Sequence, residues 1–185
     1  MVRESKKITC KNGKEFTLVF LGSNNAEQFL DFMHQVSGET HFMSRYIDEV
    51  KIDIEAIQEE KNILKSFEED EKQAMISLFD GERIVGHIAI RRVSKSRKTE
   101  HRCIIGFGVL KEYHGLGLGT ALITQAISFA KEAGYTCMEL GVFSDNLPAQ
   151  GLYKKMGFSE YGRLPEAFIL DDGTLLDEIT MYRKL

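Results

Sequence analysis

The stretch from Val109 to Thr120, which reads VLKEYHGLGLGT, most constrains how this chain can fold. Three glycines at alternate positions, Gly115, Gly117 and Gly119, separate a strand-like run from the helix-like run ALITQAISFAKEAG. A strand-to-helix turn of this composition leaves backbone N–H groups unpaired, and without Cβ atoms a phosphate can approach them closely. The positive end of the helix dipole adds to that attraction. The stretch therefore predicts a diphosphate-binding turn.

Two common phosphate-binding motifs do not fit this turn. The dinucleotide fingerprint GxGxxG fails because Thr120, Ala121 and Leu122 follow the last glycine, and a P-loop would need a Gly-Lys-Ser/Thr sequence. A second block lies further along the chain, after the strand-like run MELGVF. It reads NLPAQGLYKKMGF, from Asn146 to Phe158.

Together the two blocks resemble the GNAT superfamily of acyl-CoA-dependent N-acetyltransferases. His114, Gly117 and Gly119 occupy the positions of its Gln/Arg-x-x-Gly-x-Gly/Ala signature. The later signature, Asn-x-x-Ala-x-x-x-Tyr-x-x-x-Gly-Phe, is matched by Asn146, Ala149, Tyr153, Gly157 and Phe158. The resemblance covers residues 73 to 185 well and the preceding residues in outline.

The resemblance implies a mixed α/β fold, with three layers, α-β-α, around a central, mixed, splayed β-sheet. It implies acetyl-CoA as co-substrate, with the acyl-pantetheine arm bonded like an extra strand to Val109 and Leu110. The residues expected to bind the cofactor are Val109, Leu110, His114, Gly115, Leu116, Gly117, Leu118, Gly119, Thr120, Asn146 and Tyr153. Histidine in place of glutamine or arginine at position 114 leaves the backbone amides to hold the pyrophosphate with less side-chain help.

Three residues are candidates for proton transfer. The resemblance implies that Tyr153 is the acid for the departing thiolate; the alternative is a tyrosine that only packs on its helix. His101 and Glu100 are the candidate bases, with Asp145 third, although His101 also fits an ordinary surface histidine. A lysine-like amine of pKa ~10.4 needs a base far more than a peptide N-terminus of pKa ~8 does.

The acceptor is expected to be an amine of a small molecule or a peptide. The segment from Asp48 to Lys72 holds ten acidic and four basic residues, and it would suit a cationic amine or form an ordinary exposed helix face. A non-catalytic acyl-CoA-binding or regulatory module on the same fold is the alternative function. A protein that binds another diphosphate ligand is a third reading.

Length and charge bound the remaining expectations. At 185 residues we expect one domain over 1–185. The net charge of -4 offers no overall attraction to nucleic acid or to an anionic membrane. The first residues carry no apolar leader, which predicts a cytoplasmic protein. Whether the chain forms a homodimer is left open by the sequence. Three dispersed cysteines indicate neither a disulfide framework nor a metal site.

Patterns along the chain predict the other elements. The run EFTLVFLG predicts a first strand, and Asn24 with Glu27 resembles a capping box before a helix that ends at Gly38. A second helical stripe joins Val50, Ile54, Ile57, Leu64 and Phe67. Two hairpins are expected, at Asp80-Gly81 and Asp172-Gly173. A strand is expected at 100–110, in which Gly106 and Gly108 suggest either a bulge or the close approach of a ligand. A helix over 121–133, a strand over 137–143 and a helix whose first turn holds Pro148 complete the prediction.

Overall fold

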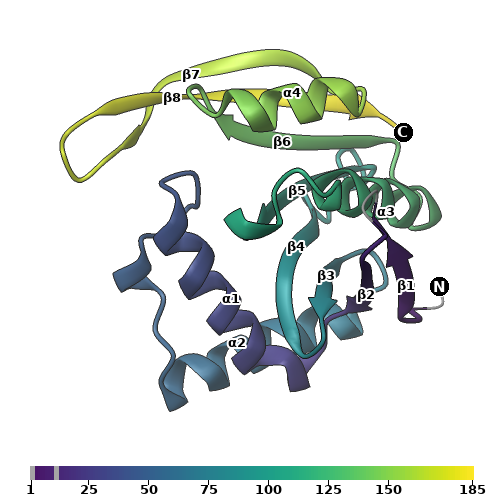
Figure 1. Ribbon diagram of the computed structural model, residues 1–185. Helices are drawn as coiled ribbons and strands as arrows, with labels where there is room; N and C mark the ends of the chain where they lie inside the picture. The colour runs from purple at the N-terminus through teal and green to yellow at the C-terminus, as the bar shows by residue number, and fades with distance from the viewer. Residues whose placement is uncertain (1–2, 11–12) are drawn as a thin grey trace.

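The computed structural model describes residues 3–10 and 13–185, and Figure 1 shows their arrangement. The strands are β1 (Lys6–Thr9), β2 (Glu15–Phe20), β3 (Ala74–Asp80), β4 (Arg83–Arg92), β5 (Arg102–Val109), β6 (Cys137–Phe143), β7 (Ser159–Ile169) and β8 (Leu175–Lys184). The α-helices are α1 (Ala26–Glu39), α2 (Ile54–Glu69), α3 (Leu118–Glu132) and α4 (Leu147–Lys155). Short 3-10 helices are η1 (Ser23–Asn25), η2 (Ile47–Glu49) and η3 (Lys111–Tyr113).

The described strands form one eight-stranded sheet in the order β1-β2-β3-β4-β5-β6-β8-β7. All neighbouring strands are antiparallel except β5 and β6, which are parallel. Parallel neighbours need a crossover connection, and α3 supplies it between β5 and β6. The sheet is therefore mixed, as expected.

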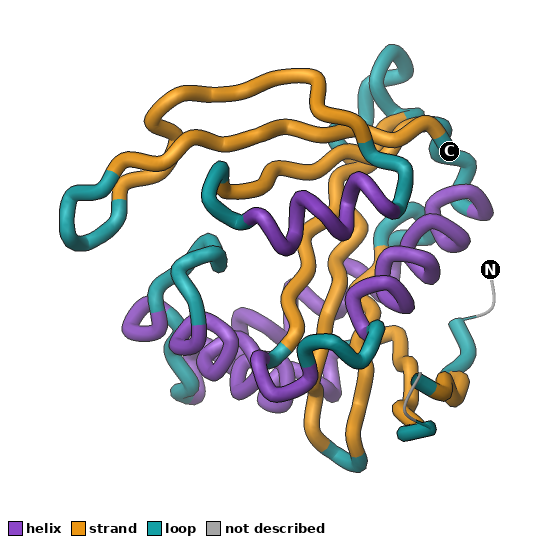
Figure 2. The backbone as a smooth tube through the Cα atoms, turned by 45° about the horizontal axis from the view of Figure 1, so that its top comes forward, coloured by secondary structure: helices purple, strands orange, loops and turns teal. Residues whose placement is uncertain are grey.

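Helices cover both faces of the sheet. Gly86 of β4 and Gly108 of β5 belong to adjacent cross-strand pairs, so they point to opposite faces. A Cβ on Gly108 would meet Val36 of α1, whereas a Cβ on Gly86 would meet Leu122 of α3. Helices α1 and α2 thus pack on one face, and α3 and α4 pack on the other (Figure 2). This arrangement confirms the expected three-layer α/β fold.

The sheet splays open between β5 and β6. These strands pair only where Arg102, Cys103 and Ile104 lie beside Cys137, Met138 and Glu139. Beyond Ile104 and Glu139 they separate, and β6, β8 and β7 bend away from the first five strands (Figures 1 and 2). The backbone groups that face the opening beyond this point have lost their neighbouring strand.

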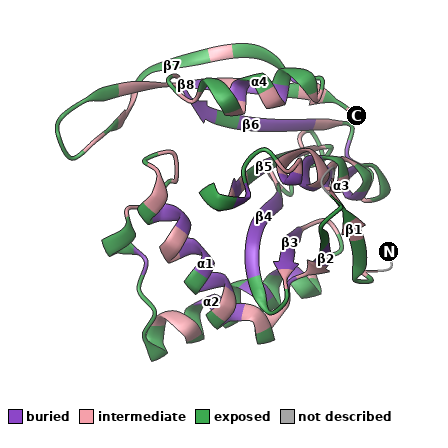
Figure 3. Cartoon of the chain, viewed as in Figure 1, coloured by how far each residue is buried: buried purple, intermediate pink, exposed green. Residues whose placement is uncertain are grey.

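The core lies along the two central antiparallel strands. Every residue of β3 except Asp80 is buried, as are residues 84–90 of β4, whereas β7 at the edge of the sheet is mostly exposed (Figure 3). Burial on both faces explains why these two strands read as continuous apolar runs without alternation. The opening between β5 and β6 thus stands beside a well-packed framework.

Several local predictions are confirmed where a glycine or proline sets the backbone. Gly81 and Gly173 adopt positive φ angles of 62° and 83° in the two hairpin turns. Gly134 follows Ala133, the C-cap residue of α3, with a φ of 83°, and Pro148 lies in the first turn of α4. The three glycines have a left-handed backbone that few other residues adopt readily, whereas Pro148 lies where its missing N–H interrupts no helical hydrogen bond.

Three local predictions are wrong. The helix α1 is not capped by Asn24; Asn25 precedes it and accepts a hydrogen bond from the Gly22 amide instead. The predicted stripe from Val50 to Phe67 is not one helical face, because Val50 lies before α2, which begins after its N-cap Asp53, and Ile54 is 86% exposed. Strand β1 was not expected, because its sequence KKIT is polar and mostly exposed at the sheet edge.

The expected bulge in β5 is also absent from its pairing with β4. The register runs without a shift from Gly86 and Val109 to Arg92 and Cys103, and the shift in this part of the sheet lies in β3, between Leu78 and Phe79. The splay therefore arises because β5 and β6 stop pairing.

Candidate active site

The glycine turn connects the end of β5 to α3. Gly115 and Gly117 have φ angles of 80° and 87°, and an added Cβ on either would meet nothing within 4 Å. This left-handed conformation strains other residue types, which explains two of the three glycines. The backbone between Gly115 and Leu118 therefore approaches open space, as a ligand-binding turn requires.

A run of unpaired amides follows this turn. Ala121 is the first residue of α3 whose N–H bonds back along the chain, to the Gly117 carbonyl at 3.1 Å. In the part of the chain that the structure describes, the N–H groups from Gly115 to Thr120 have no acceptor. Six successive donors at the N-terminus of a 15-residue helix form a strong anion-binding site. Only the backbone of Leu118 contributes, since its side chain is buried in the core.

Gly119 has a different role from the other two glycines. An added Cβ would lie 2.8 Å from Cδ2 of Leu152 and 3.5 Å from the Phe107 ring. The absence of a side chain thus lets the first turn of α3 pack against α4. The predicted contact between Gly119 and the cofactor would therefore involve only the backbone amide of Gly119.

The His114 side chain folds back toward β5. Its Nε2 lies 2.9 Å from the Val109 carbonyl oxygen, so this imidazole is held at the end of the strand. The predicted contact between His114 and the pyrophosphate stays a prediction.

The register of β4 and β5 determines which backbone groups of β5 face the splay. The Leu110 N–H bonds to the Val85 carbonyl at 3.0 Å and the Val93 N–H bonds to the Arg102 carbonyl at 3.1 Å. Because hydrogen-bonded pairs alternate in an antiparallel ladder, the backbone groups of Phe107 and Val109 point toward β6. β6 does not reach them, so they form an open strand edge inside the sheet.

This geometry corrects the expectation for Leu110. Its N–H is bonded to β4, its carbonyl accepts the Tyr113 N–H at 2.9 Å, and its side chain is fully buried. We assign the strand-like contact to Phe107 and Val109 instead. Phe107 was missed because its orientation depends on the register of β4 and β5, which the local sequence does not encode.

Tyr153 on α4 lies against the same part of β5. Its ring makes edge contacts with Phe107 at 5.6 Å and Phe158 at 5.8 Å, and the residue is 6% exposed. Burial raises the pKa of the Tyr153 hydroxyl above its ordinary value, so the hydroxyl keeps its proton. Among the described residues this hydroxyl has no hydrogen-bond partner. It is therefore available to a ligand.

Two polar side chains fix the start of α4. Asn146 accepts the Ala149 N–H at 3.2 Å and so caps the helix. Gln150 is buried and donates to the carbonyls of Phe143 and Ser144 at 3.1 and 3.0 Å, which ties α4 to the end of β6. These bonds position Tyr153; a cofactor contact by Asn146 stays a prediction.

The structure does not bring the first two candidate bases to this site. Glu100 and His101 precede β5, and the His101 carbonyl accepts the Thr136 N–H at 3.0 Å, where β5 and β6 still run together. Val109 lies eight residues further along, about 26 Å away at ~3.3 Å per residue. We therefore withdraw both as bases. Asp145 lies nearer, but its carboxylate is paired with His41 at 2.8 Å.

The opposite face of β5 and β6 forms an uncovered surface beside the splay. Ile104 is 43% exposed, and Gly106 and Gly141 are also exposed on these central strands. The segment after α1 borders this surface, because Met43 lies next to Gly108 and the Phe42 ring lies 5.9 Å from that of Phe143. Exposed residues therefore border the splay on the face opposite to α3 and α4.

Charged groups border this surface. Glu139 accepts two hydrogen bonds from Arg102, at 2.5 and 2.7 Å, and they lower the pKa of its carboxyl. Among the acidic residues between Asp48 and Lys72, only Glu60 is buried, with 6% of its surface exposed. Burial raises the pKa of Glu60, and the positive charges of Arg45 and Arg91 lower it by a smaller amount. The remaining acidic residues of α2 are exposed, as an ordinary helix face would be. Glu178 of β8 lies directly over Gly141.

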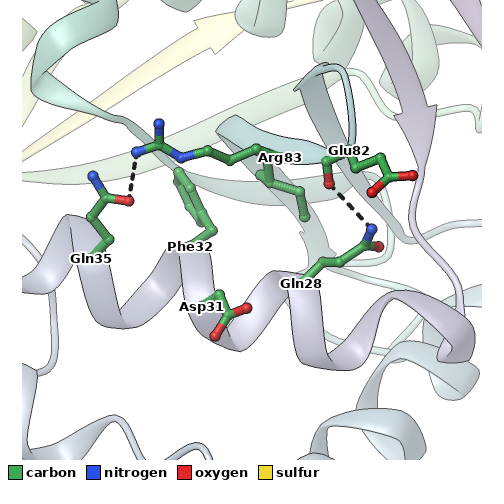
Figure 4. Close-up of a pocket in the computed structure, with 7 residues that line it drawn as sticks. Gln28, Asp31, Phe32, Gln35, Glu82 and Arg83 are labelled. Carbon is green, nitrogen blue, oxygen red and sulfur yellow. Dashed lines mark hydrogen bonds between the residues drawn. The ribbon is translucent and has the colours of Figure 1, made fainter.

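A second hollow lies elsewhere, between α1 and the turn from β3 to β4 (Figure 4). Arg83 donates to the Gln35 side chain at 2.8 Å, and Gln28 donates to the Glu82 carbonyl at 3.2 Å. These bonds tie α1 to β4, and the hollow contains no unpaired run of amides. We therefore place the site at the glycine turn and the splay.

No described helix is long and apolar enough to cross a membrane. No group of three or more histidine, cysteine, aspartate or glutamate side chains in the described chain is arranged to hold a metal ion.

Comparison with known proteins identifies similar sequences. A sequence profile of the acetyltransferase (GNAT) family matches residues 33–158. An uncharacterized N-acetyltransferase of Methanocaldococcus jannaschii is 40% identical over 68 residues, which cover 37% of this chain and 30% of that protein. The N-alpha-acetyltransferase of Sulfurisphaera tokodaii is 32% identical over 108 residues, covering 52% of this chain and 62% of that protein. The chain thus spans less than two thirds of either relative.

Solved structures share the fold. An acetyltransferase of the GNAT family from Streptococcus pneumoniae superimposes with a TM-score of 0.85 at 23% identity, covering 92% of this chain and 99% of that one. The structure of yncA, a putative acetyltransferase from Salmonella typhimurium with its cofactor acetyl-CoA, has a TM-score of 0.74 at 18% identity, covering 92% and 94%.

Proposed function

Because the chain belongs to the acetyltransferase (GNAT) family, we propose that it transfers the acetyl group of acetyl-CoA to a primary amine of a small molecule or peptide. The observation that carries this proposal is the run of six unpaired amides from Gly115 to Thr120. A pyrophosphate has the charge and the acceptor oxygens that such a run of donors would satisfy. Hydrogen bonds to a charged group contribute about 1.5–3 kcal/mol each, so a few of them suffice for tight binding.

The open edge of β5 continues from this anion site into the splay. The free backbone groups of Phe107 and Val109 would bond the amide-containing arm of the cofactor as an added strand does. The Val109 carbonyl has two lone pairs, and the bond from His114 leaves one of them for this purpose. The acetyl-CoA-bound structure of yncA, which shares the fold, supports the choice of this ligand. When bound, acetyl-CoA supplies the thioester that the amine attacks.

We assign Tyr153 to the leaving thiolate. Its hydroxyl remains protonated, lies against Phe107 at the splay and has no internal partner. The raised pKa keeps the proton on the hydroxyl before reaction, and the hydroxyl donates it to sulfur as the C–S bond breaks and negative charge develops there.

The acceptor amine would approach from the uncovered face of β5 and β6. This places it on the side opposite to α3 and α4, so the two substrates would not compete for the same entrance. The relative from Sulfurisphaera tokodaii is called an N-alpha-acetyltransferase, which favours testing α-amino groups first.

The proposal is tested by thiol release. Acetyl-CoA is offered with a panel of amino acids, peptides with free N-termini, polyamines and aminoglycosides, and the free thiol is measured together with acetylated product. We expect amine-dependent thiol release and tight CoA binding by calorimetry. Tight binding without thiol release for any amine would instead identify a non-catalytic acyl-CoA-binding module, and the absence of CoA binding at millimolar concentrations would overturn both.

A further inference from the structure

We propose that Glu178 is the catalytic residue that takes the proton from the attacking amine, an inference that rests on the transferase function proposed above. Glu178 belongs to β8, and nothing in its local sequence distinguishes it from the other acidic residues of the last hairpin. Its position relative to the splay is what sets it apart.

The Glu178 carboxylate occupies the space that a side chain at Gly141 would fill. An ideal Cβ on Gly141 would lie 1.9 Å from Oε1 of Glu178, 2.8 Å from its Cδ and 3.2 Å from its Cγ. The φ angle of Gly141 is not positive, so its backbone does not need glycine. Glycine here instead leaves room for a carboxylate from the neighbouring strand to lie on β6.

This carboxylate stands at the level where the sheet opens. Ile104 and Glu139 are the last paired residues of β5 and β6, and Gly141 lies two residues beyond Glu139. Continuing the same register, Gly106 of β5 is level with Gly141, and Phe107 is level with Val142, one residue further along. Phe107 is the residue that Tyr153 contacts. Glu178 and Tyr153 therefore flank the same level of the opening.

The two side chains lie on opposite faces of the sheet. Glu178 is the cross-strand partner of Phe143, whose ring packs against Phe42 on the α1 side. Tyr153 lies on α4, on the other side. A thioester held in the opening would present its sulfur to Tyr153 and its carbonyl carbon to an amine beside Glu178.

Glu178 is also a carboxylate without an internal partner among the described residues. The acidic groups near it are engaged: Glu139 with Arg102, Asp177 with Arg163 at 2.9 Å, and Asp145 with His41. An unpaired carboxylate beside an exposed strand surface attracts a cationic or neutral amine and can accept its proton.

In the proposed acetyl transfer from sulfur to nitrogen, each proton and each electron pair has a donor and an acceptor. The amine nitrogen gives its lone pair to the carbonyl carbon, forms the N–C bond and becomes acidic as it gains positive charge. Glu178 accepts the released proton. The C–S bond breaks with its electron pair on sulfur, which takes the Tyr153 proton. Solvent then removes the proton from Glu178 and restores the one on Tyr153.

The decisive variant is Glu178→Gln, assayed with an active amine that has a lysine-like pKa. We expect kcat to fall by roughly 10²-fold or more, as for loss of a general base, while calorimetric CoA affinity stays within twofold. The matched control is Glu160→Gln on the adjacent strand β7, whose exposed side chain faces away from Gly141; it should keep wild-type kcat. Thermal unfolding of both variants shows whether the fold is intact.

A second variant tests the position rather than the charge. Gly141→Ala places a methyl group where the carboxylate lies, so it should displace Glu178 and lower kcat about tenfold or more, as a misplaced catalytic group does, without loss of CoA binding. Wild-type kcat in either variant would overturn the assignment. A raised KM with unchanged kcat in Glu178→Gln would overturn it too, since the residue would then only hold the amine. Failure of the wild type to release thiol would instead overturn the transferase function itself.

Discussion

Gly119 and Leu152 approach each other so closely that a methyl group on Gly119 would lie 2.8 Å from Leu152 Cδ2. This contact joins the helix that carries the free amides to the helix that carries Tyr153. We therefore expect Gly119→Ala to cost about 1 kcal/mol of unfolding free energy, because Leu152 must shift. Leu152→Ala should remove part of that cost, with a coupling of about 0.5 kcal/mol or more in a double-mutant cycle measured by urea denaturation. Additive effects of the two substitutions would contradict the contact.

Substitution of Gly117 by alanine tests the proposed anion site. Alanine at this φ of 87° costs about 1–2 kcal/mol, and relaxation of the turn would redirect the amides beyond it. We expect CoA affinity to fall roughly tenfold or more in Gly117→Ala, since each lost hydrogen bond to a charged oxygen costs about 1.5–3 kcal/mol. The measurement is calorimetry with CoA.

Gly134 provides a matched control for this prediction. It has a φ of 83°, equally open surroundings and a place just after α3, at the end opposite to the amides. Gly134→Ala should lose a similar amount of stability and keep its CoA affinity. Equal losses of affinity in the two variants would show that the effect comes from general strain.

Tyr153→Phe keeps the ring that packs against Phe107 and Phe158 and removes only the hydroxyl. If the hydroxyl protonates the leaving sulfur, kcat should fall by ~10²- to 10⁴-fold in steady-state assays. Tyr135→Phe is the control, because Tyr135 is also buried but donates its hydroxyl to the Lys72 carbonyl at 2.7 Å. Tyr135→Phe should lower the free energy of unfolding by about 1 kcal/mol and keep the wild-type kcat. A decrease below fivefold in Tyr153→Phe would remove it from the role of acid.

The features that the sequence predicts well are those set by backbone chemistry within a few residues. The strand-turn-helix at Gly115 and Gly117, the hairpin turn at Gly81 and the start of α4 at Pro148 each depend on one residue type with a special φ. The motifs that carry the family resemblance are built from the same positions. This is why the fold and the anion site follow from the sequence.

The features that it misses depend on segments far apart in the chain. Glu178 meets Gly141 only because β8 pairs with β6 in one register, and a shift of one residue would turn Glu178 to the other face. His101 and Glu100 fail for the converse reason: they lie just before the start of β5, and the local sequence does not reveal which end of that strand reaches the site. Gly119 must be glycine because α4 packs closely against it through Leu152, and the local sequence does not show this contact.

His87 lies buried between α1 and the sheet and makes the stability of the fold depend on pH. Its Nδ1 lies 3.0 Å from the Ser77 hydroxyl, and its ring contacts Phe29 at 4.6 Å and Phe32 at 6.3 Å. Burial, with a smaller contribution from the positive charge of Arg91, lowers its pKa to about 3. The folded protein therefore keeps this histidine neutral at pH values where the unfolded chain protonates it.

The unfolded state consequently binds one more proton between about pH 6.5 and pH 3, and the free energy of unfolding must fall as the pH is lowered through this window. From pH 7 to pH 5 the His87 contribution amounts to about 2 kcal/mol, at ~1.4 kcal/mol per pH unit. His87→Gln keeps a polar partner for Ser77 and cannot titrate. Urea denaturation at both pH values should show the wild type losing about 2 kcal/mol more than this variant. Replacement of the exposed His101 by glutamine controls for loss of a histidine as such, and equal acid losses in wild type and His87→Gln would contradict the buried neutral state.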